Sequence, residues 1–179
     1  MKYPISPNDS ERVEFVKNLA ILDTHPGENL NRVVTLCHTI FDVPIANISI
    51  VADDREWFMT GIGLNSPEES RDKALCNFTI VGDDIFEVPN ALEHPEISQS
   101  PLVTETPGIR YYAGAPLKYD EYNLGALCLI DTKPRKPLDD RERKILQELS
   151  RMVVREIRIQ RILRESLAFI AQEAINAKD

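Results

Sequence analysis

Apolar residues recur at helical spacing in two segments near the N-terminus. Residues 11–22 follow Asp9, which can cap a helix, and their apolar positions form one broad face. A second helix is predicted to start at Asn29 or Asn31 and to end before Pro44. The apolar positions of this second helix suggest that it packs against a sheet.

Two pairs of β-strands are predicted further along the chain. Residues 46–63 show two β runs around Asp53, Asp54 and Arg55, the pattern of a hairpin. Residues 109–117 and 124–131 form a second antiparallel pair. Both runs are nearly continuously apolar and rich in Ala and Gly, so we expect central strands with a helix packed closely on one face. The larger side chains of the pair are expected to line the other face: Tyr111, Tyr112 and Cys128.

The segment between the two pairs gives weaker signals. Residues 65–73 read as a polar loop, and residues 73–81 fit a short helix or a short strand, because the apolar run is too short to decide. A short strand is predicted at residues 85–90. Residues 91–97 are expected to form a short helix or an ordered loop that stops near Pro95.

A long helix is predicted after Asp139 and Asp140. One apolar line along it, interrupted by Glu156 and Ser166, contains Ile145, Leu149, Met152, Ile159, Leu163 and Ile170. A second line contains Leu146, Val153, Ile157 and Leu167. Two apolar lines on one helix predict that one side packs on the domain and that the other meets a partner helix.

The order of these elements predicts an α+β fold with a central antiparallel sheet between helices. A length of 179 residues suits one domain, assigned to residues 1–165 with its N-terminal helix, followed by a helical extension over residues 166–179. The sequence does not decide whether this chain is complete or a fragment of a longer protein.

The net charge of −8 argues against a general affinity for nucleic acid or for anionic membranes. Arg151, Arg155 and Arg158 share a helix face, and we interpret them as a solvated face or an ion-paired dimer seam. The N-terminus lacks the apolar core of a signal peptide, and no apolar run is long enough to span a bilayer. The expected location is the cytoplasm, which suits the three widely spaced cysteines.

Several short motifs, in this order, resemble the GAF domain of bacterial signalling proteins. They are Ile21–Thr24, Asp54–Phe58, Arg71 with Cys76 and Thr79–Ile80, the stretch SPLVTETPGIRYYAGAPL from residue 100, and LGALCLIDTKPR from residue 124. The resemblance covers about residues 10–165. It implies a central antiparallel sheet with the N- and C-terminal helices on one face and a pocket on the other.

The resemblance also implies a function. We expect a non-enzymatic sensory module that binds an unidentified small molecule and transmits the signal through the terminal helices of a homodimer. Its output partner is expected to be a histidine kinase or a diguanylate cyclase, while the ligand and any cofactor stay unknown. The resemblance places the segments of Cys76 and Cys128 near the pocket. The ligand is expected to bind beside Trp57, Arg71, Cys76, Phe78, Arg110, Tyr112 and Cys128.

Phe78 marks a departure from the family pattern, because relatives commonly carry a histidine at this position, two residues after the cysteine. This substitution argues against a metal, haem or acid–base role at residue 78. The three histidines lack metal-ligand spacing, so a metal site would require residues that meet only in the folded structure. No catalytic or metal-binding residue is therefore predicted.

Two alternatives stay open at this point. The first is a ligand-free module that signals only by dimerisation. The second is a thiol-dependent methionine sulfoxide reductase, because some GAF-like enzymes use three cysteines for that reaction. The spacing of Cys37, Cys76 and Cys128 does not resemble that enzyme's pattern, and buried packing thiols are the simpler interpretation.

Overall fold

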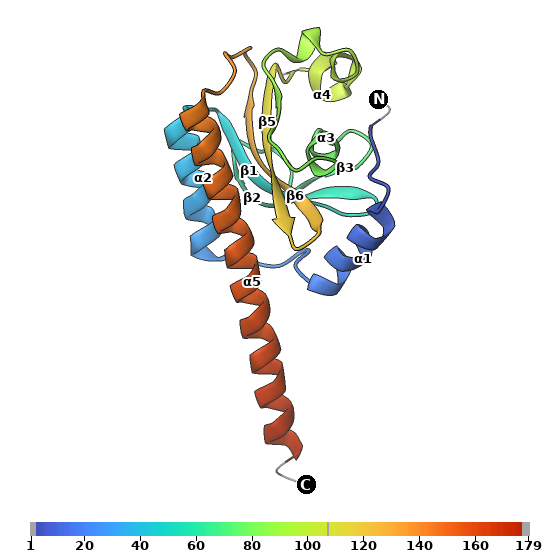
Figure 1. The fold of residues 1–179 in the computed structure, drawn as a ribbon, viewed down its shortest axis with the longest axis vertical. Coiled ribbons are helices and arrows are strands. Elements are labelled where there is room, and N and C mark those ends of the chain that lie inside the picture. The colour runs from blue at the N-terminus through green and yellow to red at the C-terminus, as the bar shows by residue number, and fades with distance from the viewer. Residues whose placement is uncertain (1–2, 107, 177–179) are drawn as a thin grey trace.

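A six-stranded antiparallel sheet lies at the centre of the computed structural model, which describes residues 3–106 and 108–176 (Figure 1). The strand order is β3-β2-β1-β6-β5-β4. The strands are β1 (Ile45–Val51), β2 (Arg55–Ile62), β3 (Glu68–Ser70), β4 (Phe86–Val88), β5 (Tyr111–Tyr119) and β6 (Tyr122–Asp131). This arrangement confirms the predicted α+β fold and both predicted strand pairs.

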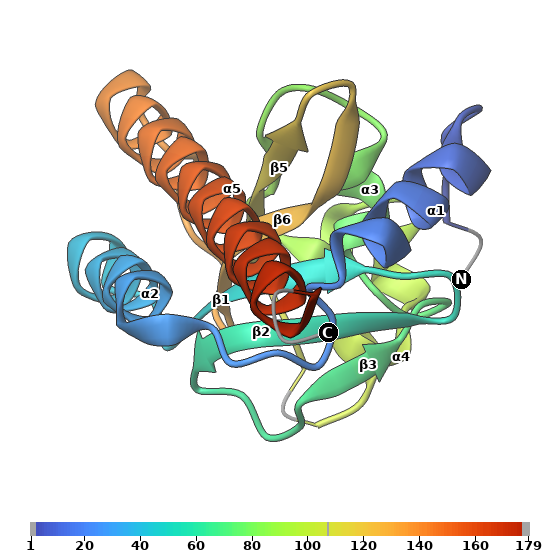
Figure 2. The ribbon, with the colours of Figure 1, turned by 90° about the horizontal axis from the view of Figure 1, so that it is seen from below.

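Three long helices cover one face of the sheet, as Figure 2 shows from below. They are α1 (Asp9–Leu19), α2 (Gly27–Phe41) and α5 (Asp140–Asn176). The other face carries two short helices and two 3₁₀ turns: α3 (Cys76–Ile80), η1 (Ala91–Glu93), η2 (Ile97–Gln99) and α4 (Pro101–Thr104). Both terminal helices therefore lie on one side of the sheet, as the sequence predicted.

Alternation along the strands divides the core into two clusters. Ile48 and Ile50 of β1 pack with the long helices, whereas Val51 belongs to the cluster beneath α3 and α4. A β-bulge in β2 opposite Ile48 and Ser49 adds one residue to that strand. Because successive side chains point to opposite faces, β1, β5 and β6 each contribute to both clusters.

The small residues of the second strand pair allow close packing on both faces. Ala113 and Ala115 lie in the cluster beneath the long helices, and α5 packs against β5. A Cβ atom on Gly114 would come within 2.4 Å of the Thr79 hydroxyl oxygen on α3. The prediction of one closely packed helix was therefore incomplete, because α3 also approaches the opposite face.

Other elements differ in detail from the sequence predictions. Helix α2 begins at Gly27, before the predicted asparagines. The predicted polar loop contains the edge strand β3, which forms by pairing with β2 in spite of its two glutamates. Residues 73–81 contain the helical alternative, α3, and residues 91–97 contain the 3₁₀ turn η1.

Helix α5 has two parts with different surroundings. Up to Ile157 its inner face packs on the domain through Leu146, Leu149, Ser150, Val153, Val154 and Ile157. Gln160 and Arg164 still donate hydrogen bonds to the carbonyl oxygens of Pro26 and Leu19, and the C-terminal part of the helix then projects away from the sheet (Figure 1). Several large apolar side chains along the helix are exposed: Met152, Ile159, Ile162, Leu163, Leu167, Phe169, Ile170 and Ile175. Among the described residues, no helix combines the length and hydropathy that crossing a bilayer requires.

A buried ion-pair cluster joins α1 to the segment that precedes α3. Arg71 donates two hydrogen bonds to the Asp9 carboxylate, at 2.7 and 2.8 Å. Arg12 donates to Asp9 at 2.8 Å and to the Val51 carbonyl oxygen at 2.7 Å. Burial alone would raise the pKa of Asp9, but hydrogen bonds from both arginines outweigh it, so the pKa is lowered.

Replacing this carboxylate should destabilise the fold. Asp9→Asn leaves Arg12 and Arg71 buried without a counter-ion, and we expect the free energy of unfolding at neutral pH to fall by about 3 kcal/mol. Because the folded-state pKa of Asp9 is lowered, the difference between wild type and variant is full above about pH 4 and shrinks as the pH falls through that pKa. Urea unfolding at several pH values measures this difference.

Asp53→Asn is the matched control. It removes an ion pair with Lys17 in which both side chains are 54% exposed, so its effect should stay within experimental scatter. Equal stability losses in the two variants would contradict the role of the buried cluster.

Candidate functional site

A cavity of about 240 Å³ lies on the sheet face opposite the long helices. Its apolar wall consists of Ile45, Phe58, Leu64, Leu75, Leu102, Ile109 and Ile130. Its polar lining consists of Asn47, Glu56, Asn65, Ser66, Glu68, Glu69, Cys76 and Tyr112. The described lining residues include three glutamates and no lysine, arginine or histidine, so the cavity has acidic character.

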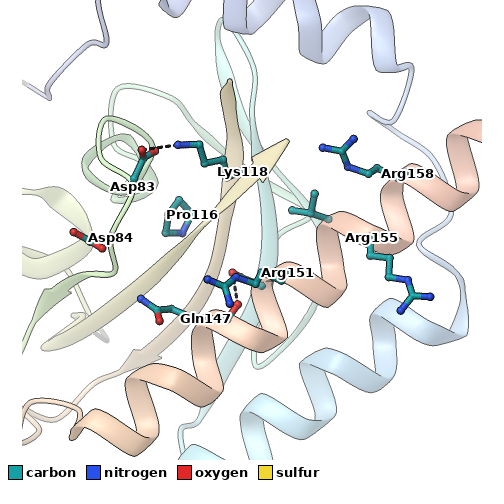
Figure 3. A pocket seen from close by; sticks show the side chains of 10 residues that line it. Asp83, Asp84, Pro116, Lys118, Gln147, Arg151, Arg155 and Arg158 are labelled. Atoms are coloured by element: carbon teal, nitrogen blue, oxygen red, sulfur yellow. Dashed lines mark hydrogen bonds and ion pairs between the residues drawn. The ribbon is translucent and has the colours of Figure 1, made fainter. Parts of the chain in front are cut away.

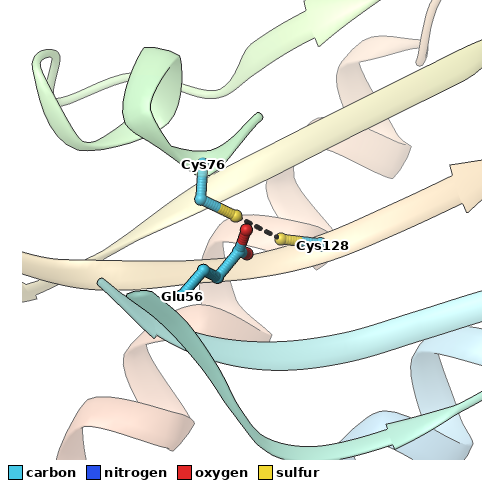
Figure 4. A group of neighbouring side chains, drawn as sticks. All are labelled: Glu56, Cys76 and Cys128. Atoms are coloured by element: carbon cyan, nitrogen blue, oxygen red, sulfur yellow. Dashed lines mark hydrogen bonds between the residues drawn. The ribbon is translucent and has the colours of Figure 1, made fainter. Parts of the chain in front are cut away.

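Two thiols meet beside the cavity. The Sγ atoms of Cys76, at the start of α3, and Cys128, on β6, lie 3.2 Å apart. The Ser49 hydroxyl lies 3.1 Å from the Cys76 sulfur, and the Tyr112 hydroxyl donates to the same sulfur at 3.3 Å. Figure 4 shows the Glu56 carboxyl group pointing toward both sulfur atoms.

Strand alternation brings these groups to one face. Asn47 of β1 lies opposite Cys128 of β6 in the register, and Ser49 follows two residues later on the same side. Glu56 lies opposite Val51, which also belongs to this face. Polar residues at alternate positions of otherwise apolar strands thus produce a polar cluster beneath α3.

Burial controls the protonation of this cluster. It raises the pKa of the Glu56 carboxyl, although hydrogen bonds with Cys76 and Ser49 oppose the shift. Burial, reinforced by the neighbouring Cys128, also raises the pKa of the Cys76 thiol well above its ordinary range. Burial likewise raises the pKa of Tyr112. The site therefore favours neutral thiol and hydroxyl groups when nothing positive is bound.

Asn47 has a buried oxygen without a hydrogen-bond partner. The residue is 1% exposed, and its Oδ1 atom has no partner among the described residues. A buried polar atom of this kind costs free energy unless something else satisfies it. Because Asn47 also lines the cavity, a bound molecule is well placed to supply the missing donor.

The structure places four of the seven predicted residues in the buried cluster beneath α3 and α4. Cys76 and Tyr112 line the cavity, and Cys128 contacts Cys76. Phe78 lies in the same apolar cluster but stacks on Phe86, with ring centroids 5.4 Å apart, and does not line the cavity.

The other three predicted residues have structural contacts elsewhere. Trp57 lies on the opposite face, in the core beneath the long helices, because it alternates with Glu56 and Phe58. Arg71 belongs to the ion-pair cluster with Asp9. Arg110 donates hydrogen bonds to the carbonyl oxygens of Val103 and Ile109, at 2.8 and 3.0 Å.

Alternation also separates the two tyrosines that the sequence analysis grouped together. Tyr112 faces the cavity, whereas Tyr111 lies in the core beneath the long helices, so the expectation that both line one face was wrong for Tyr111. The sequence analysis missed Glu56, Asn47 and Ser49. The polar–apolar alternation in residues 46–51 is the signal that could have found Asn47 and Ser49, whereas the inward position of Glu56 follows from strand pairing.

A second depression, of about 350 Å³, lies between β5 and α5 (Figure 3). It has mixed charge, and several of its cations already have partners. Lys118 pairs with Asp83 at 2.5 Å, and Arg158 pairs with Asp120 at 2.7 Å. Arg151 pairs with Glu148, so two of the three arginines on this helix face are ion-paired within the chain, and a role in a dimer seam stays a prediction.

The architecture is that of an α+β domain with terminal helices on one face of a sheet and a cavity on the other. The sequence matches the family model for the GAF domain over residues 25–157. The chain belongs to the GAF domain family.

A signalling protein is among the relatives. A cyclic di-GMP phosphodiesterase of Pseudomonas aeruginosa is 36% identical over 155 residues, which are 86% of this chain and 26% of that protein. The chain thus spans about a quarter of the length of this relative.

Solved structures share the fold. The GAF domain of a phosphoenolpyruvate-protein phosphotransferase from Coxiella burnetii matches with a TM-score of 0.65 and 15% identity, over 87% of this chain and 96% of that one. A free methionine-R-sulfoxide reductase from Neisseria meningitidis, in complex with its substrate, matches with a TM-score of 0.62 and 16% identity, over 91% and 98% of the two chains. At these identities the likeness shows the fold alone.

All three cysteines are free and buried, and we expect the native thiols to resist alkylation. Burial raises the pKa of Cys37 to about 12, which lowers its thiolate fraction at pH 8 by more than about a thousandfold relative to an ordinary thiol of pKa near 8.5. Mass spectrometry after timed iodoacetamide treatment should show no rapid modification of the native protein and three modifications after denaturation. A native thiol that reacts as fast as the denatured ones would instead favour thiol chemistry.

Proposed function

We propose that this GAF domain is a non-enzymatic sensory module that binds a small molecule in the 240 Å³ cavity. The observation that carries the proposal is the unpartnered Asn47 oxygen in a cavity with an apolar wall. Binding sites for small molecules commonly combine apolar walls with a few polar groups that fix orientation. The raised pKa of the Cys76 thiol argues against a reactive nucleophile and so favours binding over catalysis.

The lining suggests the chemical class of the ligand. Glu56, Glu68 and Glu69 line the cavity, and no cationic side chain lines it among the described residues, so an anionic ligand would be repelled. Arg55 already pairs with Glu68 at the rim. A compact, largely apolar molecule with a hydrogen-bond donor or a positive group fits this lining best, because Asn47 and the carboxyl groups can accept from it.

Native mass spectrometry of the protein purified from its own host tests ligand binding. We expect a retained small molecule that is released on denaturation. Ile130→Trp fills part of the cavity and should lower the retained fraction at least about tenfold, since it overlaps the ligand's space. Ile40→Trp, on the exposed side of α2, should retain the ligand as the wild type does.

Two results would contradict this prediction. If wild-type protein retains no compound and no compound raises its melting temperature in a thermal-shift screen, the ligand-free dimerisation module is favoured. Equal retention in Ile130→Trp and wild type would place the ligand outside this cavity.

We further propose that two copies of the chain dimerise through α5. Its exposed side carries Met152, Ile159, Leu163 and Ile170, four members of the first apolar line read from the sequence. Leu149 of that line packs on the domain instead, and Leu167 of the second line is exposed. A helix that exposes so much apolar surface beyond its own domain is better accounted for by a partner helix than by solvent.

Charges on this side of α5 should separate the dimer. The double variant Ile159→Asp/Leu163→Asp places carboxylates in the proposed seam, and we expect the dissociation constant to rise at least about a hundredfold. Sedimentation velocity measures the change. Leu92→Asp, an equally exposed apolar position on η1, should leave the assembly unchanged. A double variant that stays dimeric would exclude this seam.

We propose that the domain regulates the activity of a separate signalling domain or protein. The sequence analysis named a histidine kinase or a diguanylate cyclase, and the Pseudomonas relative suggests a cyclic di-GMP phosphodiesterase as a further candidate. In each case the ligand would act by binding two arrangements of the helices with different affinities. The three free thiols suit a protein that is located in the reducing cytoplasm.

A further inference from the structure

Two thiols and a carboxyl group from three different elements converge beside the cavity. One ligand atom each from Glu56 of β2, Cys76 of α3 and Cys128 of β6 lies within 4.8 Å of the other two. All three residues are buried. Figure 4 shows the carboxyl group and both sulfur atoms directed toward one another. The fold thus holds two thiols and a carboxyl group around a common point.

The spacing suits a metal ion better than a disulfide. Zinc binds thiolate sulfur at about 2.3 Å, so two sulfurs at tetrahedral angles lie roughly 3.7 Å apart. The observed separation of 3.2 Å needs to open by about half an ångström for zinc. A disulfide bond would require the sulfurs to approach to about 2.05 Å, a movement more than twice as large.

Among the described residues, the cavity lining supplies no positive charge for the three groups when they are ionised. The described residues that line the cavity include no lysine, arginine or histidine, and all three groups are buried, where an isolated ionised group is costly. A divalent cation removes this cost, because it supplies two positive charges at the point where the ligand atoms meet.

Neighbouring hydroxyl groups are placed to support thiolate ligands. Tyr112 donates to the Cys76 sulfur at 3.3 Å, and the Ser49 hydroxyl lies 3.1 Å from it. Tyr112 is itself held by Thr79, with 2.7 Å between the two oxygens. Hydrogen bonds to ligand atoms commonly orient metal ligands and stabilise their charge.

An open side remains toward the cavity. Glu56 and Cys76 both line it, whereas Cys128 lies behind them. The unpartnered Oδ1 atom of Asn47 lines the same space and can accept a hydrogen bond from a metal-bound water or ligand group. Three protein ligands and one open position are the arrangement of zinc sites that exchange their fourth ligand.

We propose that Glu56, Cys76 and Cys128 bind a zinc ion whose fourth coordination position opens into the cavity. Binding is a ligand exchange without electron transfer. Zinc gives up bound water molecules, while the two thiols and, where protonated, the carboxyl group release their protons to solvent. The site goes beyond the proposed sensory function, since the metal can be measured without any organic ligand or any dimer.

Cobalt titration of the full chain tests the site. Protein freed of metal by a chelator and kept reduced should bind one equivalent of Co²⁺, with a thiolate-to-cobalt charge-transfer band and the visible bands of a tetrahedral ion. Zn²⁺ should displace the cobalt. The affinity of Cys76→Ser and of Cys128→Ser should fall more than about a hundredfold, because changing even an outer hydrogen-bonding group costs roughly 10- to 100-fold.

Two further variants keep the test interpretable. Cys37→Ser changes a buried thiol that belongs to the other core cluster, and it should bind cobalt as the wild type does. Glu56→Gln keeps the side-chain shape, so it should retain the thiolate band at lower affinity even if a cysteine variant fails to fold. Circular dichroism identifies the folded variants.

Several results would overturn the zinc site. The first is a cobalt titration of reduced wild-type protein that shows no thiolate band. The second is an unchanged cobalt affinity in folded Cys76→Ser or Cys128→Ser. The third is native protein that contains no metal and has a mass lower by two hydrogen atoms. The last result would show a disulfide in place of a metal. None of them bears on ligand retention, which the native mass spectra of the Ile130→Trp series measure separately.

Discussion

Strands β1 and β6 are covered on both faces, and the structure depends on this constraint. Six of the seven residues of β1 are buried, so each position must suit whichever layer it faces. A one-residue shift in register would move Ile48 and Ile50 to the cavity face and expose Asn47 and Ser49 to the apolar core. Gly125 of β6 helps to fix the pairing, because a Cβ atom there would lie 1.9 Å from the Ser49 carbonyl oxygen.

The same constraint places the proposed ligand cavity and the proposed dimer helix on opposite sides of one sheet. The cavity face collects the polar residues of β1 and β2 with the thiols of α3 and β6, while the other face binds the terminal helices. β5 and β6 contact α5 on one side and α3 on the other. Strands β5 and β6 therefore connect the cavity side directly to the long helix.

Much of the fold could be predicted because it rests on local periodicity. Helices α1, α2 and α5 and the strand pairs β1–β2 and β5–β6 all show their pattern in the sequence. The edge strand β3 could not be found, since its two glutamates have little β propensity and pairing with β2 decides its structure. The site was predicted only in part. The segments of Cys76 and Cys128 came from the resemblance and Tyr112 from the strand pattern. Trp57 was placed on the wrong face, because the sequence does not show which strand face points to the helices. Glu56 and the meeting of two distant cysteines depend on tertiary structure.

We propose that occupation of the cavity changes the helices on the far side of the sheet. Hydrogen–deuterium exchange of the full chain, with and without the compound recovered from the native protein, measures this directly. We predict slower exchange in β1, β2 and α3 together with a change in α5 beyond Ile157. Protection confined to the cavity face, with α5 unchanged, would contradict transmission through the sheet, and protection confined to the long helices would contradict the cavity itself.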